Sequence, residues 1–315
     1  MEAEMEKYII LPDVTCDLTE EMREYFGITD YIPGHISLGN GREELTELQW
    51  KFMSSKEFYK ALSDKKSQIS TAPPNIDEYC EKFEKYINEG YAIISMSISG
   101  KISSTYDFAT VAAKRVMEKH PDAKIYCVDT LRMSGAIGLL VCYAYEMQKN
   151  GKSFDEVVEW LETNKTKVHQ MGPIDDLFYV ARRGRLTMGK AIMGTIVGVK
   201  PLGDFNDYGY TTVLARVKGI NKALAATIDY VKETAIDIEN QYVFVIHTDR
   251  ERYALDLKEK IEKEFNPKKV FVGEAYAGCG ANIGPGMVGV YYMGADISED
   301  LSKEKEAMNK VLGAQ

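Results

Sequence analysis

The chain has few of the residues that hold disulfides or metal ions. Its 315 residues include five cysteines and four histidines. The cysteines are widely spaced, no CxxC pair occurs, and no histidine lies at ligand spacing from another histidine or from a cysteine. These spacings disfavour a disulfide framework and a structural zinc site. We therefore expect neither a metal nor a cofactor.

Long apolar runs and an excess of basic charge are also missing. No apolar run approaches the roughly 20 residues that span a bilayer, and residues 1–7 are acidic, unlike a secretory signal. Lys and Arg number 39 against 48 Asp and Glu, which gives a formal net charge of −9. That balance disfavours a nucleic-acid-binding protein. We expect a cytoplasmic protein without stable membrane insertion and without nucleic acid as a partner.

The composition and the first half of the chain indicate a layered globular protein. Hydrophobic residues make up 45% and charged residues 28%, and the length suggests about two domains. Up to residue 167, short β-rich runs alternate with helices that begin at capping signals. The expected strands cover residues 8–11, 31–37, 91–97 and 124–128, and the capping signals include Asp17-x-x-Glu20, Ser54-x-x-Glu57, Asn75-x-x-Glu78 and Ser153-x-x-Glu156. This order predicts an N-terminal α/β domain over residues 1–167 with a mostly parallel sheet.

The pattern changes in the second half. A turn at residues 204–209 predicts a hairpin between strands 202–205 and 210–217. Further strands are expected at 242–248, 269–275 and 287–293, with helices at 221–233 and 251–264. The mixture of hairpins and helices predicts a C-terminal α+β domain over residues 168–315 with a mixed or antiparallel sheet.

Two glycine-containing segments come close to nucleotide-binding motifs. Residues Gly184–Ala191 nearly match a P-loop, but Ala191 has no hydroxyl for magnesium and the preceding segment has a helical period instead of a strand pattern. A nucleotide-dependent phosphotransferase is therefore the alternative function, and a plain helix end followed by a loop is favoured. Residues Gly278–Gly286 lack the dinucleotide spacing. They predict a tight loop that either connects two strands or turns its backbone N–H groups toward an anion.

Hydroxyl side chains gather where a buried strand meets a helix. Residues Ser97–Thr105 run from the carboxyl end of the expected strand 91–97 into a helix start. This is where ligands bind in open α/β sheets, and a helix N-terminus suits an anion. Ordinary N-capping explains one hydroxyl but not both Ser103 and Ser104. A second hydroxyl loop, Ser70–Asn75, also precedes a helix, so we expect a site for a small carboxylate or phosphate.

Seven segments, taken in chain order, resemble motifs of the DegV family of bacterial lipid-binding proteins. The match extends over nearly the whole chain. The segments are Pro12–Leu18, Ser70–Pro74, Ser99–Tyr106, Asp129–Thr130, Gly184–Leu186, Lys200–Pro201 and Asn282–Gly286.

The resemblance implies a binding protein without catalytic residues, built of two α/β domains with a long-chain fatty acid between them. It implies that Ser70 and Ser103 donate hydrogen bonds to the carboxylate, with Thr71 and Ser104 beside them. Asn282 stands where the family has a histidine near the head group, and an asparagine stays neutral at every pH.

The resemblance also implies a partner, a fatty acid kinase that receives the acyl chain. The densest basic cluster, Arg182, Arg183 and Arg185, is the candidate docking site, and a solvated surface is its simpler interpretation. Candidate residues for the acyl-tail tunnel, which plain core packing would also explain, are Ile192, Met193, Ile196 and Met287.

Overall fold

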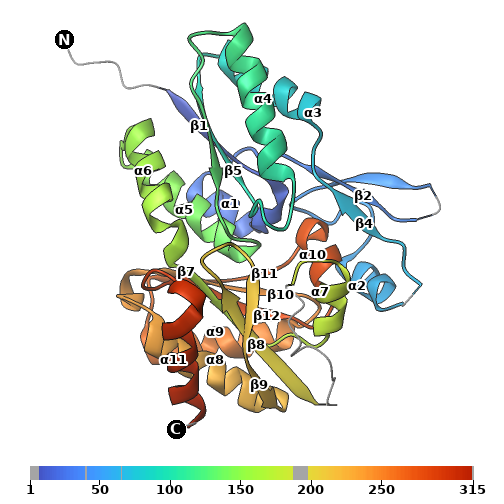
Figure 1. The fold of residues 1–315 in the computed structure, drawn as a ribbon, viewed down its shortest axis with the longest axis vertical. Helices are drawn as coiled ribbons and strands as arrows, with labels where there is room; N and C mark the ends of the chain where they lie inside the picture. Colours follow the sequence, from blue (N-terminus) through green and yellow to red (C-terminus); the bar gives the residue numbers. More distant parts are fainter. Residues whose placement is uncertain (1–6, 40, 65, 187–197, 314–315) are drawn as a thin grey trace.

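The computed structural model describes residues 7–39, 41–64, 66–186 and 198–313 (Figure 1). Its N-terminal sheet has the order β1-β5-β6, and all three strands are parallel. Helices α3 and α4 cover one face of this sheet, and helices α1, α5 and α6 cover the other. The layered, mostly parallel α/β arrangement predicted for this half is confirmed. The bounds are β1 Tyr8–Pro12, α1 Glu20–Phe26, α3 Ile76–Asn88, β5 Ala92–Ser97, α4 Thr105–Lys119, β6 Ile125–Asp129, α5 Gly135–Lys149 and α6 Phe154–Asn164.

A second sheet has the order β11-β10-β12-β7 and is mixed, as predicted. Strand β10 is parallel to β11, and β12 is antiparallel to both of its neighbours. Side chains of β10 alternate, because successive residues of a strand point to opposite faces. Phe244 and Ile246 pack toward α5, whereas Val243 and Val245 pack toward α8 and α9. The bounds are β7 Val168–Met171, α8 Ile220–Thr234, β10 Tyr242–His247, α9 Glu251–Phe265, β11 Lys269–Glu274 and β12 Val288–Met293.

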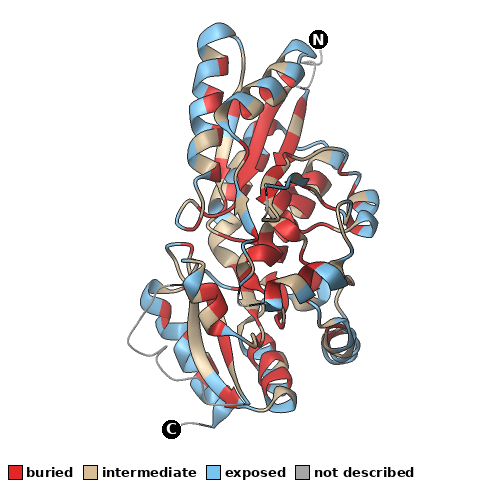
Figure 2. Ribbon diagram, turned by 90° about the vertical axis from the view of Figure 1, so that its right-hand side faces the viewer, coloured by how far each residue is buried: buried red, intermediate tan, exposed pale blue. Residues whose placement is uncertain are grey.

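Helix α5 lies between the two sheets (Figure 1). Ten of its 15 residues are buried, and one hydrophobic cluster joins them to residues of both halves of the chain. Its glycines permit close packing. A Cβ at Gly138 would lie 2.6 Å from the carbonyl oxygen of Cys16, and one at Gly135 would lie 2.7 Å from side-chain atoms of Ile246. Figure 2 shows the buried residues concentrated on the strands and on the inner faces of the helices.

Two smaller sheets and four more helices complete the described fold. Strands β3, β2 and β4 form an antiparallel sheet, and β8 pairs with β9 in the predicted hairpin. The capping boxes expected at Ser54, Asn75 and Ser153 are all present. The bounds are β2 Gly34–Ser37, β3 Glu43–Thr46, α2 Ser55–Ser63, β4 Ser70–Ala72, α7 Leu177–Arg182, β8 Val199–Phe205, β9 Thr211–Lys218, α10 Ala277–Ile283 and α11 Ser302–Leu312.

Three local predictions were wrong. Asp17 does not cap a helix: Thr19 caps α1, and Asp17 is fully buried in a left-handed backbone conformation. Residues 70–72 form the edge strand β4 instead of a loop. The segment predicted as a glycine loop is helical as far as Ile283. Its glycines serve packing, since a Cβ at Gly280 would lie 2.5 Å from the hydroxyl of Tyr59.

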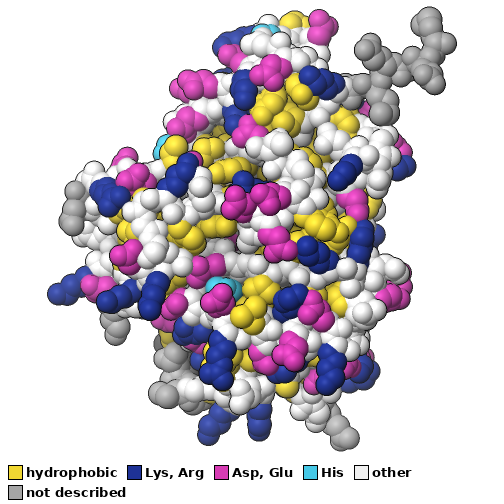
Figure 3. All heavy atoms as spheres, turned by 180° about the vertical axis from the view of Figure 1, so that it is seen from behind, with side chains coloured by type: hydrophobic (Ala, Val, Ile, Leu, Met, Phe, Trp, Pro, Cys, Tyr) yellow, Lys and Arg dark blue, Asp and Glu magenta, His cyan; other side chains and the backbone are white. Residues whose placement is uncertain are grey.

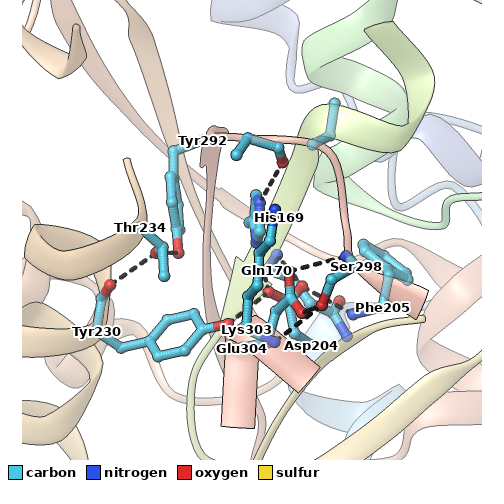
Figure 4. A network of polar contacts seen from close by, with 12 residues as sticks. His169, Gln170, Asp204, Phe205, Tyr230, Thr234, Tyr292, Ser298, Lys303 and Glu304 are labelled. Carbon is cyan, nitrogen blue, oxygen red and sulfur yellow. Dashed lines mark hydrogen bonds and ion pairs between the residues drawn. The ribbon is translucent and has the colours of Figure 1, made fainter. Parts of the chain in front are cut away.

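A buried polar network connects β7, β8, α8 and the segment after β12 (Figure 4). The Asp204 carboxylate accepts hydrogen bonds from His169 Nδ1 (2.7 Å), the hydroxyl of Tyr230 (3.1 Å) and the backbone N–H groups of Gln170 (2.8 Å) and Phe205 (2.7 Å). His169 Nε2 donates to the carbonyl oxygen of Ala295 (2.9 Å). Both ring nitrogens of His169 face acceptors, an arrangement that favours the imidazolium. Burial alone would lower the pKa of His169, but the Asp204 charge raises it above its usual value.

Over the described residues, no helix is both long and apolar enough to cross a bilayer. Figure 3 shows acidic and basic side chains interspersed with apolar ones over the face seen from behind.

Candidate functional site

Two neighbouring cavities contain most of the residues that the sequence singled out. The polar walls of the first, which we call the hydroxyl-lined cavity, are Asp13, Thr15, Thr46, Thr71, Ser103, Thr105, Arg185 and Asn282. The second, the apolar cavity, is lined mostly by hydrocarbon side chains. Met133 and Arg185 line both cavities, so the two spaces adjoin.

The hydroxyl-lined cavity lies at the carboxyl ends of two parallel strands. Asp13 directly follows β1, and Ser103 lies between β5 and α4. Neighbouring parallel strands end at the same edge of a sheet, where open α/β folds bind ligands. Strand β4 supplies Thr71 to the cavity, and helix α10 supplies Asn282.

Asn282 sets the direction in which the Thr71 hydroxyl can donate. Its Nδ2 donates a hydrogen bond to Thr71 Oγ1 at 2.9 Å. A hydroxyl that accepts from an amide keeps its own hydrogen for another acceptor. Among the described residues, no acceptor takes that hydrogen. Thr71 therefore offers a hydrogen-bond donor to a ligand.

Ser103 and Thr105 supply a second donor. Their hydroxyl oxygens are 2.7 Å apart, and the backbone N–H of Thr105 donates to Ser103 Oγ at 3.3 Å. Whichever hydroxyl donates in this pair, the hydrogen of the other is left for a ligand.

Asp13 is a carboxylate whose acceptor capacity is largely used. It accepts from the backbone N–H groups of Thr15 (2.7 Å) and Ile98 (2.8 Å) and from the Thr15 hydroxyl. Burial raises the pKa of Asp13, and these hydrogen bonds oppose the rise. Since the Thr15 hydroxyl donates to Asp13, Thr15 presents lone pairs to the cavity and cannot help to hold an anion.

Arg185 brings positive charge to the junction of the two cavities. Its side chain is half-buried, and its guanidinium donates to the carbonyl oxygen of Arg183. Burial, together with the nearby Arg183, lowers the pKa of Arg185. An arginine with a lowered pKa is still a cation at neutral pH. The sequence analysis placed Arg185 on a docking surface, whereas the structure places it in the cavity walls.

The predicted head-group residues divide into two sets. Thr71, Ser103 and Asn282 line the hydroxyl-lined cavity together, whereas Ser70 and Ser104 are exposed and lie outside its lining. Adjacent residues of a strand point to opposite faces, so Ser70 and Thr71 cannot both face one cavity. Ser104 sits at the N-cap of α4, where its side chain makes no capping hydrogen bond.

Other predicted residues lie elsewhere. Met287 lines the apolar cavity. Ile192, Met193 and Ile196 lie outside the described residues, as does the end of the near P-loop; its described beginning, Gly184, follows helix α7 and not a strand. Arg182 is exposed, and Arg183 donates to the Tyr179 hydroxyl at 3.0 Å. Within the described ranges, no group of three His, Cys, Asp or Glu side chains is placed to hold a metal ion.

Sequence reasoning missed several residues of the cavity walls. Asp13 and Thr15 lay in one of the segments that carried the family resemblance and directly followed an expected strand, which was a usable signal. Thr105 ended the hydroxyl-rich segment Ser97–Thr105, which was also a usable signal. Met133 carried none, because an isolated methionine is common in any core.

Asp17 connects the start of α10, a helix of the cavity wall, to the start of α5 through hydrogen bonds. Its carboxylate accepts from Ser134 Oγ at 2.6 Å and from the backbone N–H of Tyr276 at 2.8 Å. Burial raises the pKa of Asp17 to about 7, although these hydrogen bonds oppose the rise.

We expect Asp17→Asn to flatten the pH dependence of stability. Between about pH 4 and pH 7 the folded chain keeps a proton that the unfolded chain has released, so the stability of the wild-type protein falls as pH rises through this window. The loss attributable to Asp17 is about 2–4 kcal/mol. Urea unfolding of both proteins at pH 5 and pH 8 measures it. Equal slopes for the two proteins would show that Asp17 is ionised throughout.

Comparison with known proteins decides the family. The family model described as "Uncharacterised protein, DegV family" matches residues 7–295. The chain belongs to the DegV family. A DegV domain-containing protein of Clostridium perfringens is 30% identical over 295 residues, which cover 92% of this chain and 98% of that protein. A Thermotoga maritima relative described as a fatty acid-binding protein is 28% identical over 286 residues, covering 90% of this DegV-family chain and 96% of the relative.

Solved structures agree with the fold of this DegV-family protein. A DegV lipid binding protein from Thermotoga maritima superposes with a TM-score of 0.79 at 26% identity, covering 92% of this chain and 99% of that one. The fatty acid kinase (Fak) B3 protein of Streptococcus pneumoniae, loaded with linoleic acid, gives a TM-score of 0.77 at 19% identity, covering 92% and 100%. At 19% identity, the similarity to the Streptococcus pneumoniae protein shows a shared fold alone.

Proposed function

We propose that this protein binds a long-chain fatty acid between residues 1–167 and residues 168–315. The carboxylate lies in the hydroxyl-lined cavity and the acyl tail in the apolar cavity. The observation that carries the proposal is the shared wall: Met133 and Arg185 belong to both cavities, so a polar site with free donors lies directly beside an apolar one. Relatives described as fatty acid-binding and lipid-binding proteins support the same ligand class.

The hydroxyl-lined cavity suits a carboxylate because of its donors. Thr71 and the Ser103–Thr105 pair each have a hydroxyl hydrogen to give, and Arg185 supplies a positive charge. Asp13 would repel an anion, but its oxygens are already engaged by three donors. Hydrogen bonds to a charged acceptor are the strong kind, each worth about 1.5–3 kcal/mol.

The apolar cavity suits the tail because most of its walls are hydrocarbon. Removing each methylene group of a ligand from water contributes about 0.8 kcal/mol, so a long tail supplies most of the affinity. Methionines adapt to irregular tails. The apolar walls are Met133, Met171, Ile174, Leu177, Val180, Leu186, Pro201, Leu202, Val213, Ile283, Met287, Val288 and Tyr291.

We also propose that the protein acts as a carrier that presents its fatty acid to a fatty acid kinase. The fold shared with the fatty acid kinase (Fak) B3 protein of Streptococcus pneumoniae supports this role. The exposed Arg182 and the neighbouring Arg183 border a surface groove with Asp64, Phe178 and Pro285. They are the candidate contacts for an acidic patch on such a partner.

Thr71→Val tests the placement of the head group. The variant keeps the shape of the side chain and removes the donor, so affinity for octadecanoic acid is expected to fall by about 1–3 kcal/mol. Ser70→Ala is the matched control, because Ser70 is exposed on the same strand and should bind as the wild type does. Titration calorimetry measures both variants. An equal loss in both would place the carboxylate elsewhere, and a wild-type protein that binds no fatty acid would refute the proposed function.

A further inference from the structure

Besides Arg185, a polar pair interrupts the hydrocarbon walls of the apolar cavity. Gln170 on β7 and Thr211 at the start of β9 both line this cavity. Gln170 Nε2 donates a hydrogen bond to Thr211 Oγ1 at 3.0 Å. We call these two residues the Gln–Thr pair.

The buried network behind β7 holds Gln170, one member of the Gln–Thr pair, in position (Figure 4). Adjacent side chains of β7 point to opposite faces. His169 stacks on Tyr292 in the network, and Gln170 pairs across the strands with Tyr291, which also lines the apolar cavity. The backbone N–H of Gln170 is fixed by the buried Asp204 carboxylate at 2.8 Å. The amide of Gln170 is thus presented to the cavity by a rigid strand.

The pair has hydrogen-bonding capacity left over. The Thr211 hydroxyl accepts from Gln170, and the nearest acceptor for its hydrogen is Met133 Sδ at 3.8 Å, a weak acceptor. In the part of the chain that the structure describes, Gln170 Oε1 has no hydrogen-bond partner. If the amide is turned over, its N–H group and the Thr211 oxygen are left instead. In either orientation the Gln–Thr pair offers at least one donor and one acceptor.

One donor beside one acceptor is the complement of a hydroxyl group. A saturated tail would displace water from the pair and leave both groups unsatisfied, which is unfavourable. A carbon–carbon double bond would use neither group, and a ketone would use the donor alone. A hydroxyl gives its hydrogen to the acceptor and takes a hydrogen bond from the donor.

We propose that the ligand of this protein is a fatty acid that carries a hydroxyl group along its chain, recognised by Gln170 and Thr211. This inference rests on the proposed function and names its substrate class more closely. The hydroxyl-lined cavity binds the carboxylate, and the Gln–Thr pair forms hydrogen bonds with the hydroxyl group on the acyl chain.

The test compares octadecanoic acid with its 3-, 10- and 12-hydroxy derivatives, binding each to the wild-type protein and to Gln170→Leu. Leucine removes the amide but keeps the backbone N–H that Asp204 holds. We expect at least one hydroxy acid to bind the wild type about tenfold more tightly than octadecanoic acid does, and the preference to disappear in the variant. Thr211→Val should reduce the same preference, and thermal unfolding checks that both variants fold.

The outcomes separate this inference from the proposed function. Binding of octadecanoic acid with no preference for any hydroxy acid would overturn the inference alone, as would a preference that persists in both Gln170→Leu and Thr211→Val. Failure of all four acids to bind the wild type would overturn the proposed function. A preference lost in Gln170→Leu while octadecanoic acid still binds would support both.

Discussion

Replacing Asp204 by alanine is expected to lower the free energy of unfolding by about 3–5 kcal/mol. The substitution leaves buried His169, Tyr230 and the backbone N–H groups of Gln170 and Phe205 without their shared acceptor. Asp204 is fully buried, so these donors lose their acceptor inside the fold and away from bulk solvent. Urea unfolding at pH 6 measures the loss.

Two further variants make the Asp204 result specific. Asp204→Asn keeps an acceptor oxygen for the backbone N–H groups of Gln170 and Phe205 but loses the charge and the second acceptor oxygen, so it should cost less than alanine. The pKa of His169 is raised, so its ion pair with Asp204 stabilises the wild type fully below about pH 6.5 and is lost as the imidazolium deprotonates at higher pH. The difference in stability between the wild type and Asp204→Asn should therefore shrink as pH rises. Asp256→Ala, at a partly exposed site paired with Lys260, should change stability by less than about 1 kcal/mol. If Asp204→Ala cost no more than that, the network would contribute nothing to stability.

Asn282→Asp is expected to weaken fatty acid binding at least about 100-fold at pH 8. Asparagine donates to Thr71 Oγ1, which leaves the Thr71 hydrogen for the ligand. An aspartate of the same shape would accept that hydrogen and remove the donor. It would also add a second negative charge to a cavity that already contains Asp13.

A control with the same change of charge tests whether position matters. Asn309→Asp, on the exposed face of α11, should bind fatty acid as the wild type does. Equal melting temperatures would show that the loss in Asn282→Asp comes from the cavity and not from unfolding. Wild-type affinity in Asn282→Asp would mean that residue 282 does not approach the carboxylate.

The large elements of this fold could be predicted because their signals are local. Helices α2, α3 and α6 begin at reciprocal caps within four residues of sequence, and buried runs such as 92–97 are too apolar to be anything but core. Asp17 and Glu20 have the same spacing as a capping box. The Asp17 carboxylate instead accepts hydrogen bonds from Ser134 and Tyr276, which are far away in the sequence. A tertiary contact outweighed the local signal there.

The candidate site could be predicted only in part, for a related reason. Which of Ser70 and Thr71 faces the cavity depends on the pairing of β4 with β2, and a shift of one residue exchanges them. The Gln–Thr pair joins residues 170 and 211 across two strands that the hydrophobic pattern does not place side by side. Positions of this kind depend on strand pairing, which the sequence pattern did not determine.

The position of α5 between the two sheets has a consequence during synthesis. Residues 135–149 leave the ribosome long before Ile246 and Tyr291, the side chains that approach α5 at Gly135. Since chains begin to fold from the N-terminus as they emerge, the nascent N-terminal half carries an uncovered apolar helix face until β10 and β12 have been made. A ribosome stalled between α6 and β10 would therefore hold a folding intermediate with exposed hydrophobic surface, of the kind that chaperones bind.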